Sequence, residues 1–428
     1  MNVGEDSLKT EIRERIEQIQ KGMVPKGYKK SKAGIAPQEW EVGKAKTVFM
    51  NYSNKIHNGE STVLSVTQDR GIIPRSEVDK EIPYSESNIG SYKRVEKGNF
   101  VISLRSFEGG IEFSGYEGLV SPAYTVIKNH AAIDHGYYKQ YFKTETFISK
   151  LNSAVYGIRD GKQIGYEDFC NLRIHIPPLS EQKKIAEIIS ACDKVVELKK
   201  KLIARKRQQK RWLLENLLTG EKRLPGFRGK WKEVRLEEVC KDIIGGGTPP
   251  RNTKRYYQGS IPWVTVKDLD GAKQKYDSVE HISPDAVVDR TTRIIPKGNL
   301  IVSTRMGLGR GFINMVDMAI NQDMKGIILD NALVSTEFVY FSYIELHDLL
   351  ERLGNGSTVK GIDVQTLKKL KINLPPLPEQ TAIAEILSAA DREIGLHERH
   401  LEELKKQKKA LMQLLLTGIV RVNGQEVS

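Results

Sequence analysis

The stretch PPLSEQKKIAEIISACD, from Pro177 to Asp193, returns as PPLPEQTAIAEILSAAD, from Pro375 to Asp391. Twelve of the 17 positions are identical, and the two copies lie 198 residues apart. The same spacing aligns LLTG at residues 217–220 with LLTG at residues 415–418. Because self-similarity at a fixed spacing is typical of an internal repeat, the two copies predict a duplicated fold.

The duplication extends upstream of these stretches. KGNFVISLR, from Lys97 to Arg105, matches KGNLIVSTR, from Lys297 to Arg305, at a spacing of 200 residues. Residues 40–176 and 231–374 contain short β-branched runs that are bounded by glycine, proline and asparagine, a pattern typical of strands and turns. Each repeat is therefore predicted to contain a mixed α/β globule.

The second part of each repeat, residues 181–218 and 379–416, has no proline, and its apolar residues follow a heptad pattern. We call these heptad positions the seam: Ile185, Ile189, Cys192, Val196, Lys199, Ile203, Lys206, Lys210, Leu213 and Leu217, then Ile383, Leu387, Ala390, Ile394, His397, Leu401, Leu404, Lys408, Leu411 and Leu415. The pattern predicts two long helices, each about 57 Å in length, that pair as an antiparallel coiled coil. Ser180 is a candidate N-cap, and Gly220 and Gly418 are candidate C-terminal glycines.

These patterns predict an α+β fold with a pseudo-two-fold internal repeat, in which two mixed α/β globules are joined by two long antiparallel coiled-coil helices. Isoleucines at positions 12, 16 and 19 predict a short amphipathic N-terminal helix that completes the helical region, so both chain ends are expected to meet. The predicted segments are an N-terminal helix at 1–30, the first globule at 31–177, the central helix at 178–220, the second globule at 221–375, and the distal helix and tail at 376–428.

Composition favours a polyanionic partner. The 428 residues include 67 Lys and Arg against 54 Asp and Glu, a formal net charge of +13. Three scattered cysteines do not make a disulfide framework, and no stretch approaches the roughly 18 apolar residues that a membrane span needs. We expect a cytoplasmic protein that does not associate with membranes.

A search for catalytic motifs is largely negative. GLGRG at residues 307–311 lacks the third glycine of a dinucleotide-binding loop, and no phosphate-binding GxxxxGK[ST] motif occurs. Glu181-Gln182-Lys183 could form half of a nuclease site, but the second copy has Thr381 in place of the lysine. No histidine and cysteine cluster has the spacing of a metal site. The sequence therefore predicts a binding protein without catalytic residues or a metal.

The repeated PPLSEQ and PPLPEQ openings, the IAEI and LLTG motifs, WKEVRLEEVCKDIIGGGTPPR at 231–251 and IPWVTVKDLDG at 261–271 resemble the specificity (S) subunits of type I restriction-modification enzymes over essentially the full chain. The resemblance implies that each globule is a target-recognition domain for one part of a split site in double-stranded DNA. It also implies that the helix pair sets the spacing and docks two modification (methyltransferase) subunits, to which restriction (translocase-nuclease) subunits add. S-adenosylmethionine, ATP and magnesium would then belong to the partner subunits.

Candidate DNA contacts follow from the comparison of the two globules. Arg105 and Arg305 close equivalent strands and could bind guanine or phosphate, or form a shared structural salt bridge. Base-contacting residues should differ between the copies, which favours Thr67, Gln68, Asp69 and Arg70 in the first globule and Lys267 to Asp270 in the second. The candidate phosphate contacts are Lys29, Lys30, Arg251 and Lys254.

Two further hypotheses remain open. A coiled-coil adaptor with globules that bind protein or carbohydrate would explain the repeat, and a self-sufficient nuclease is a third possibility. The basic tract from Lys199 to Arg211 could be a solvated face, a DNA contact or a contact to an acidic partner surface. Trp212, beside this tract, is predicted to lie in the core.

Overall fold

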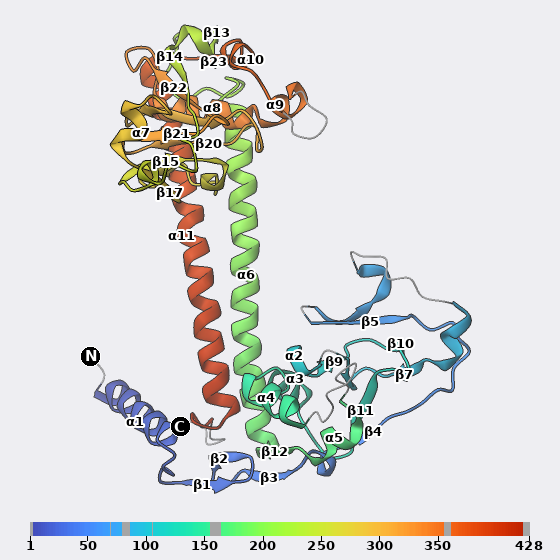
Figure 1. Cartoon of the computed structure of the whole chain (residues 1–428). Coiled ribbons are helices and arrows are strands. Elements are labelled where there is room, and N and C mark those ends of the chain that lie inside the picture. Colours follow the sequence, from blue (N-terminus) through green and yellow to red (C-terminus); the bar gives the residue numbers. More distant parts are fainter. Residues whose placement is uncertain are drawn as a thin grey trace. The chain divides into compact units, whose positions relative to one another are not determined.

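The computed structural model describes residues 3–68, 70–78, 86–104, 106–154, 164–354 and 361–422. The chain forms two compact units (Figure 1). Unit 1 comprises Met1–Lys199 and Leu401–Ser428, and unit 2 comprises Lys200–His400. Both boundaries fall inside a long helix, so each unit combines a globule with a part of each long helix.

The two predicted long helices are present as α6 (Leu179–Leu217, 39 residues) and α11 (Leu377–Leu416, 40 residues). Each begins directly after a Pro-Pro pair, since proline disfavours a helical conformation in the residue before it. The backbone N–H of Gln182 donates to the carbonyl of Pro178 (2.9 Å), so Ser180 lies inside the first turn, and its prediction as the N-cap is wrong. Gly220 and Gly418 follow the helix ends at φ of 77° and 73°, as predicted for C-terminal glycines.

Each unit on its own shows that the two helices are antiparallel. In unit 1, Ile185 and Ile189 near the start of α6 share a core with Leu415 and Leu416 at the end of α11. In unit 2, Leu214, Leu217 and Leu218 at the end of α6 share a core with Ile383 and Leu387 near the start of α11. The predicted seam is confirmed, since every seam position in both helices is buried or half-buried.

Basic residues at the seam pair with acidic residues of the opposite helix. Within unit 2, Lys206 pairs with Glu393 (2.8 Å) and Lys210 with Asp391 (2.5 Å). Within unit 1, the seam residue Lys408 forms an ion pair with Asp193. These contacts explain why a coiled coil can retain lysine at positions that usually carry apolar side chains.

The globule of unit 1 is built from short strands and helices around an aromatic core that includes Phe49, Phe100 and Phe142. Its sheets have the orders β4-β11-β8-β9, β1-β2, β12-β3, β5-β6 and β10-β7. Its elements are α1 Val3–Gln20, β1 Tyr28–Ser31, β2 Gly34–Pro37, β3 Glu41–Lys44, β4 Phe49–Asn51, β5 Leu64–Thr67, β6 Gly71–Pro74, β7 Lys93–Val95, β8 Phe100–Ile102, α2 Ser106–Gly109, β9 Glu112–Phe113, β10 Gly118–Val120, β11 Thr125–Asn129, α3 His135–Tyr141, α4 Glu145–Ala154, α5 Tyr166–Asn171 and β12 Arg173–Ile176.

The globule of unit 2 contains a five-stranded sheet in the order β14-β22-β19-β20-β16 and a four-stranded sheet in the order β17-β15-β21-β18. A β13-β23 pair adjoins the long helices. Its elements are β13 Lys232–Arg235, β14 Cys240–Gly245, β15 Ile261–Val264, β16 Gln274–Lys275, β17 Glu280–Ile282, α7 Pro284–Val288, β18 Arg293–Ile295, β19 Leu300–Ser303, β20 Gly311–Asn314, β21 Met318–Ile320, β22 Met324–Leu329, α8 Thr336–Glu345, α9 His347–Leu353, α10 Val364–Lys368 and β23 Lys371–Leu374.

The duplication is confirmed in the register of the strands. The pair Phe100↔Ile127 in unit 1 corresponds to Leu300↔Ile327 in unit 2, and both residues shift by 200. The parallel bridge Val63↔Leu119 likewise corresponds to Trp263↔Ala319. The two globules therefore share one backbone scaffold, although few of their side chains are the same.

The predicted meeting of the chain ends occurs within unit 1. Arg15 of α1 donates from Nη1 to the carbonyl of Ile419 (2.6 Å), and the hydroxyl of Tyr28 donates to the carbonyl of Gly418 (2.7 Å). The N-terminal helix thus contacts the segment that follows α11, as the circular arrangement of the repeat predicts.

A matched three-residue contact, which we call the clamp, holds the start of each long helix. In unit 1, Glu181 accepts two hydrogen bonds from Arg421 (2.8 and 3.0 Å) and one from the indole of Trp40 (2.7 Å). In unit 2, Glu379 accepts two from Arg223 (both 2.7 Å) and one from the indole of Trp231 (3.2 Å). Each clamp joins a globule, the start of one long helix and the segment after the other.

Trp212 is not part of the core. Its side chain is 46% exposed, and the ammonium of Lys222 lies 4.7 Å from its ring centroid. The physical reason is its position, because the neighbouring residues Lys210 and Leu213 occupy the seam and direct Trp212 away from it. The prediction for this residue is therefore wrong.

Candidate nucleic-acid interface

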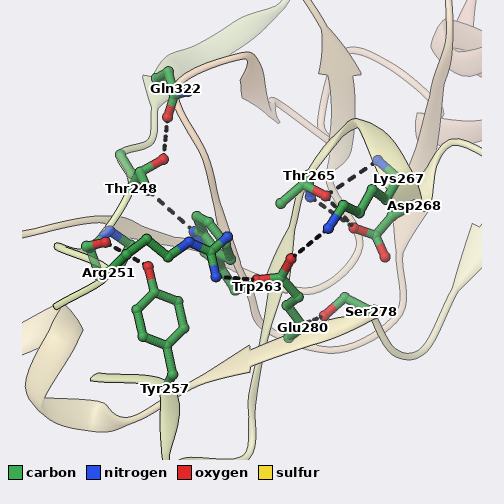
Figure 2. Close-up of polar contacts among 12 residues, drawn as sticks. Thr248, Arg251, Tyr257, Trp263, Thr265, Lys267, Asp268, Ser278, Glu280 and Gln322 are labelled. Atoms are coloured by element: carbon green, nitrogen blue, oxygen red, sulfur yellow. Dashed lines mark hydrogen bonds and ion pairs between the residues drawn. The ribbon is translucent and has the colours of Figure 1, made fainter. Parts of the chain in front are cut away.

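Two of the predicted DNA contacts in unit 2 meet at a single carboxylate (Figure 2). Nη1 of Arg251 lies 2.7 Å from Oε2 of Glu280, and Nζ of Lys267 lies 3.0 Å from Oε1 of the same side chain. The side chains of Arg251 and Lys267 are 59% and 64% exposed, whereas that of Glu280 is 21% exposed. The site therefore presents two cations to solvent around a more buried acid.

Local structure brings these three residues together. Arg251 follows the Gly-Gly-Gly-Thr-Pro-Pro turn after β14, and Glu280 begins β17, where it lies across from Trp263 of β15. Lys267 lies in a short 3-10 helix, Val266–Asp268, at the end of β15. Thr265 caps this helix by accepting from the backbone N–H of Lys267 (3.2 Å). Three separate segments within residues 251–280 thus converge at one edge of the four-stranded sheet.

Aromatic rings hold the Arg251 guanidinium in place. Its central carbon lies 4.7 Å from the ring centroid of Tyr257 and 5.2 Å from that of Trp263. Trp263 is buried and donates from its indole to the carbonyl of Gly247 (3.2 Å), while the Tyr257 hydroxyl donates to the carbonyl of Pro249 (2.5 Å). A guanidinium fixed in this way loses little conformational entropy when it binds a phosphate or a base.

The contacts between Arg251 and Glu280 shift the pKa of each group in the direction that favours its charged form. The hydrogen bond from Arg251 is the largest cause that lowers the pKa of Glu280; partial burial opposes it, and the hydrogen bond from Lys267 adds to the lowering. The same contact with Glu280 raises the pKa of Arg251. Two positive charges therefore share one negative charge.

A third predicted contact, Arg305, belongs to the same network of loops. Thr248, in the turn before Arg251, donates to the Gln322 side chain, as Figure 2 shows. Gln322 donates to Asp323 (3.5 Å), and Nη1 of Arg305 lies 3.5 Å from the Asp323 carboxylate. Lys254 begins the short 3-10 helix that contains Tyr257, and its side chain is exposed. The structure thus brings Arg251 and Lys267 into direct contact with one acid and links Arg305 to them through this loop network.

The candidates in unit 1 are more dispersed. Thr67 donates to the carbonyl of Gly71 (2.9 Å) and accepts from the backbone N–H of Arg70 (3.1 Å), so its hydroxyl holds the turn between β5 and β6. Gln68, in this turn, donates to Glu108 (3.3 Å). The predicted positions Arg105 and Asp69 lie outside the described residues.

Lys29 and Lys30 lie on β1, in a sheet separate from the β5-β6 hairpin. Nζ of Lys29 donates to the carbonyl of Gln38 (2.7 Å), and Lys30 is exposed.

Within the described part of the chain, no group of three or more His, Cys, Asp and Glu side chains is arranged to hold a metal ion. No helix among the same residues is both long and apolar enough to cross a bilayer.

The model of the type I restriction modification DNA specificity domain matches residues 37–205 and, a second time, residues 228–406. The chain belongs to this specificity family. A putative type I restriction enzyme MjaX specificity subunit from Methanocaldococcus jannaschii is 25% identical, and the match covers 92% of this chain and 97% of the relative. The EcoR124I/EcoR124II specificity subunit from Escherichia coli is 28% identical over 57% of this chain and 64% of its own length.

Solved structures agree with the fold. A chain from a study of complex assembly and conformational transition of the type I R-M system has a TM-score of 0.62 at 18% identity, with 90% of this chain and 99% of that chain covered. The HsdS subunit from Thermoanaerobacter tengcongensis has a TM-score of 0.53 at 18% identity, with 90% and 98% covered. These similarities confirm the predicted α+β fold with its repeat and long helices.

Specificity domains that recognise different sequences should differ at positions that contact bases. The residues that face the equivalent positions Val63 and Trp263 on the neighbouring segment differ in this way. Glu280 pairs with Trp263, whereas the backbone N–H of Arg75 donates to the carbonyl of Val63 (2.9 Å). The second specificity domain thus has an acidic residue, Glu280, at the position where the first has a basic residue, Arg75.

Sequence reasoning missed Glu280, Tyr257 and Gln322. The RNTKRYY run at 251–257 interleaves basic and aromatic residues, a signal that would have identified Tyr257. No local pattern marks Glu280 or Gln322, because their contacts depend on the pairing of β15 with β17 and on the turn before β22.

Proposed function

We propose that this specificity subunit recognises a split DNA sequence, with each globule binding one part of it. The observation that carries the proposal is the double match to a DNA specificity domain in a chain whose two globules share strand register but differ in their polar loop residues. One scaffold with two sets of loops suits two different half-sites.

The phosphate contacts of the second globule are assigned to Arg251, Lys267 and Arg305. All three are exposed, and the Arg251 guanidinium packs against the rings of Tyr257 and Trp263. Contacts to phosphate set the position of a protein on the duplex and make its affinity depend on salt.

The long helices are assigned two roles, to set the distance between the half-sites and to dock two modification subunits. The almost equal lengths of α6 and α11 support the first role. Exposed apolar side chains support the second, namely Val195, Leu198 and Trp212 on α6 and Leu396 on α11. Restriction subunits would add to the modification subunits.

Catalysis is assigned to the partner subunits, which would bind S-adenosylmethionine, ATP and magnesium. In this chain Glu181, the carboxylate that the nuclease hypothesis requires, is buried and accepts hydrogen bonds from Arg421 and Trp40. Its oxygens are therefore engaged in the clamp.

Binding of the chain, assembled with its modification subunits, to a random-sequence duplex at 50 and 200 mM KCl tests the proposal. We expect affinity to fall roughly a thousandfold over this range, because six or more phosphate contacts each release a counterion. Absent or salt-independent binding would contradict DNA recognition and favour a coiled-coil adaptor. Cleavage of DNA with magnesium in the absence of restriction subunits would contradict the assignment of catalysis to the partners.

A further inference from the structure

The cations assigned to phosphate binding in the second globule are already occupied. Arg251 and Lys267 both contact Glu280, at 2.7 and 3.0 Å. DNA phosphate can bind either cation fully only if it replaces this carboxylate. Glu280 therefore competes with DNA phosphate for both cations as long as its carboxylate has no other partner.

A carboxylate in this position can also recognise a base. Glutamate accepts a hydrogen bond from the exocyclic amino group of cytosine in the major groove. Glu280 lies at the start of β17, beside the cations, and its neighbours Tyr276 and Val279 are 64% and 66% exposed. The acid therefore lies where a duplex that reaches Arg251 and Lys267 would pass.

We propose that Glu280 is a specificity-determining residue. Its carboxylate would give up its ion pairs with Arg251 and Lys267 and accept a hydrogen bond from the amino group of a base, with cytosine as the best match. On a matching sequence the base amino group satisfies the carboxylate, and both cations become available to phosphates. On other sequences the carboxylate keeps its cations, and fewer phosphate contacts form. This inference rests on the proposed function and assigns one base-contacting residue to it.

The difference between the globules supports this role. Val63 in the first globule, the equivalent of Trp263, faces Arg75 rather than an acid. A residue that merely stabilised the shared scaffold would have no reason to change the sign of its charge. Specificity often depends on a contact that penalises the wrong partner, and Glu280 supplies such a contact.

The test compares Glu280→Gln with Glu233→Gln in the chain assembled with its modification subunits. Glu233 is a matched control, because it forms an exposed ion pair with Lys371 (2.6 Å) in the same unit and its replacement removes the same charge. Affinity for a duplex of arbitrary sequence is measured over a KCl series. Sequence preference is measured by selection from a random-duplex library.

We expect Glu280→Gln to raise the affinity for arbitrary duplex by about 3- to 20-fold, since each of two exposed ion pairs restrains binding by up to a factor of about five. The salt dependence should steepen by up to about 1.8 in log–log slope. The selected sequences should lose their preference at one position of one half-site. Glu233→Gln should change neither quantity.

A second substitution separates competition from a folding defect. Lys267→Met alone should leave the salt slope for arbitrary duplex almost unchanged, because Glu280 already engages this lysine. In the Glu280→Gln background it should reduce the slope by about 0.9. Equal effects of Lys267→Met in both backgrounds, or an unchanged selection profile for Glu280→Gln, would overturn the inference. If the unsubstituted complex fails to bind duplex in a salt-dependent way, the proposed function fails instead.

Discussion

At the scale of single residues, each of the two clamps stabilises a buried carboxylate at the start of a long helix. Glu181 and Glu379 are 4% and 0% exposed. A buried carboxylate is costly unless nearly all of its lone pairs are satisfied. The bidentate arginine and the indole N–H supply these hydrogen bonds, and the positive end of the helix dipole adds a further favourable contribution.

Replacement of Arg421 by methionine should destabilise unit 1. The arginine side chain is 20% exposed and engages both Glu181 and Glu39, so its loss leaves a buried carboxylate with the Trp40 indole as its remaining clamp contact. We expect a loss of about 2–3 kcal/mol, seen as a lower melting temperature in scanning calorimetry. Arg207→Met, which removes an exposed pair with Glu398, is the control and should have little effect. Equal shifts for the two variants would show that the clamp contributes no more than a surface pair.

His175 gives unit 1 a dependence on pH. Burial, with a smaller contribution from Lys150, lowers the pKa of His175 to about 4. Its ordinary value is 6.5, so the unfolded chain binds more protons than the folded chain between pH 4 and 6.5. Stability from the neutral ring is present above pH 6.5 and is lost as the pH falls towards 4.

His175→Gln should remove this dependence. Between pH 7 and 4.5 the unsubstituted protein should lose about 2 kcal/mol more stability than the variant, measured by urea unfolding at each pH. A comparison of the two proteins cancels the other titrating groups. Parallel stability curves would contradict a neutral, buried His175.

At the scale of elements, the helix pair combines an apolar seam with charged positions that specify how the helices align. Lys206 contacts Glu393, and Lys210 contacts Asp391. Lys206, Lys210 and Glu393 also contribute to the lining of a hollow of about 220 Å³ between α6 and α11 in unit 2. Apolar residues alone would tolerate a shift by one heptad. The ion pairs disfavour such a shift because it would place Lys206 opposite Ile386 or His400 in place of Glu393.

An exchange of charge at one pair tests this alignment. Asp391→Lys places two lysines together at a site where both side chains are less than a third exposed, and we expect a cost of about 1–2 kcal/mol. The double variant Lys210→Asp with Asp391→Lys should recover most of this loss in urea unfolding. The same exchange at the exposed pair Arg207 and Glu398 should have little effect at any step. Failure of the double variant to recover stability would mean that the pair does not specify the alignment.

The helices were predictable because their signal is long and regular, with no proline and a heptad that persists over some 38 residues. The exact start of α6 and the outward position of Trp212 near its end could not be predicted from the sequence. Ser180 has the chemistry of an N-cap, but the preceding prolines start the helix at Leu179. Trp212 has the size of a core residue, but it lies one position before Leu213 and therefore on the outer face.

The candidate site was predictable only in part, for a similar reason. Arg251 was identified from the sequence because it follows a glycine-rich turn, and Lys267 because its position differs between the two copies. Their meeting at Glu280 depends on the pairing of β15 with β17, which are separated by residues 265–279 and by the intervening strand β16. Short strands leave no local pattern from which such pairing can be derived.

At the scale of the whole molecule, the proposed function requires two globules that each recognise their own part of the DNA site. Replacement of residues 231–374 by the corresponding segment of another family member should change one half of the recognised sequence and leave the other half intact. The strand pairs of each globule lie within its own unit, which supports independent recognition. Selection from a random-duplex library with the assembled complex measures both halves. Changes in both halves would contradict independent recognition.

The shared strand register has a consequence for how new variants of this protein can arise. The parallel-bridge partners of Val63 and Trp263, Leu119 and Ala319, lie at equivalent positions in the two globules. By contrast, residues 68–70 separate β5 from β6, whereas the longer segment 265–279 separates β15 from β17. The backbone ladder therefore accepts insertions at this edge without being rebuilt. Mutation can lengthen or replace such a loop in one half of the gene and create a new target preference, while the inherited framework and the other half remain as they were.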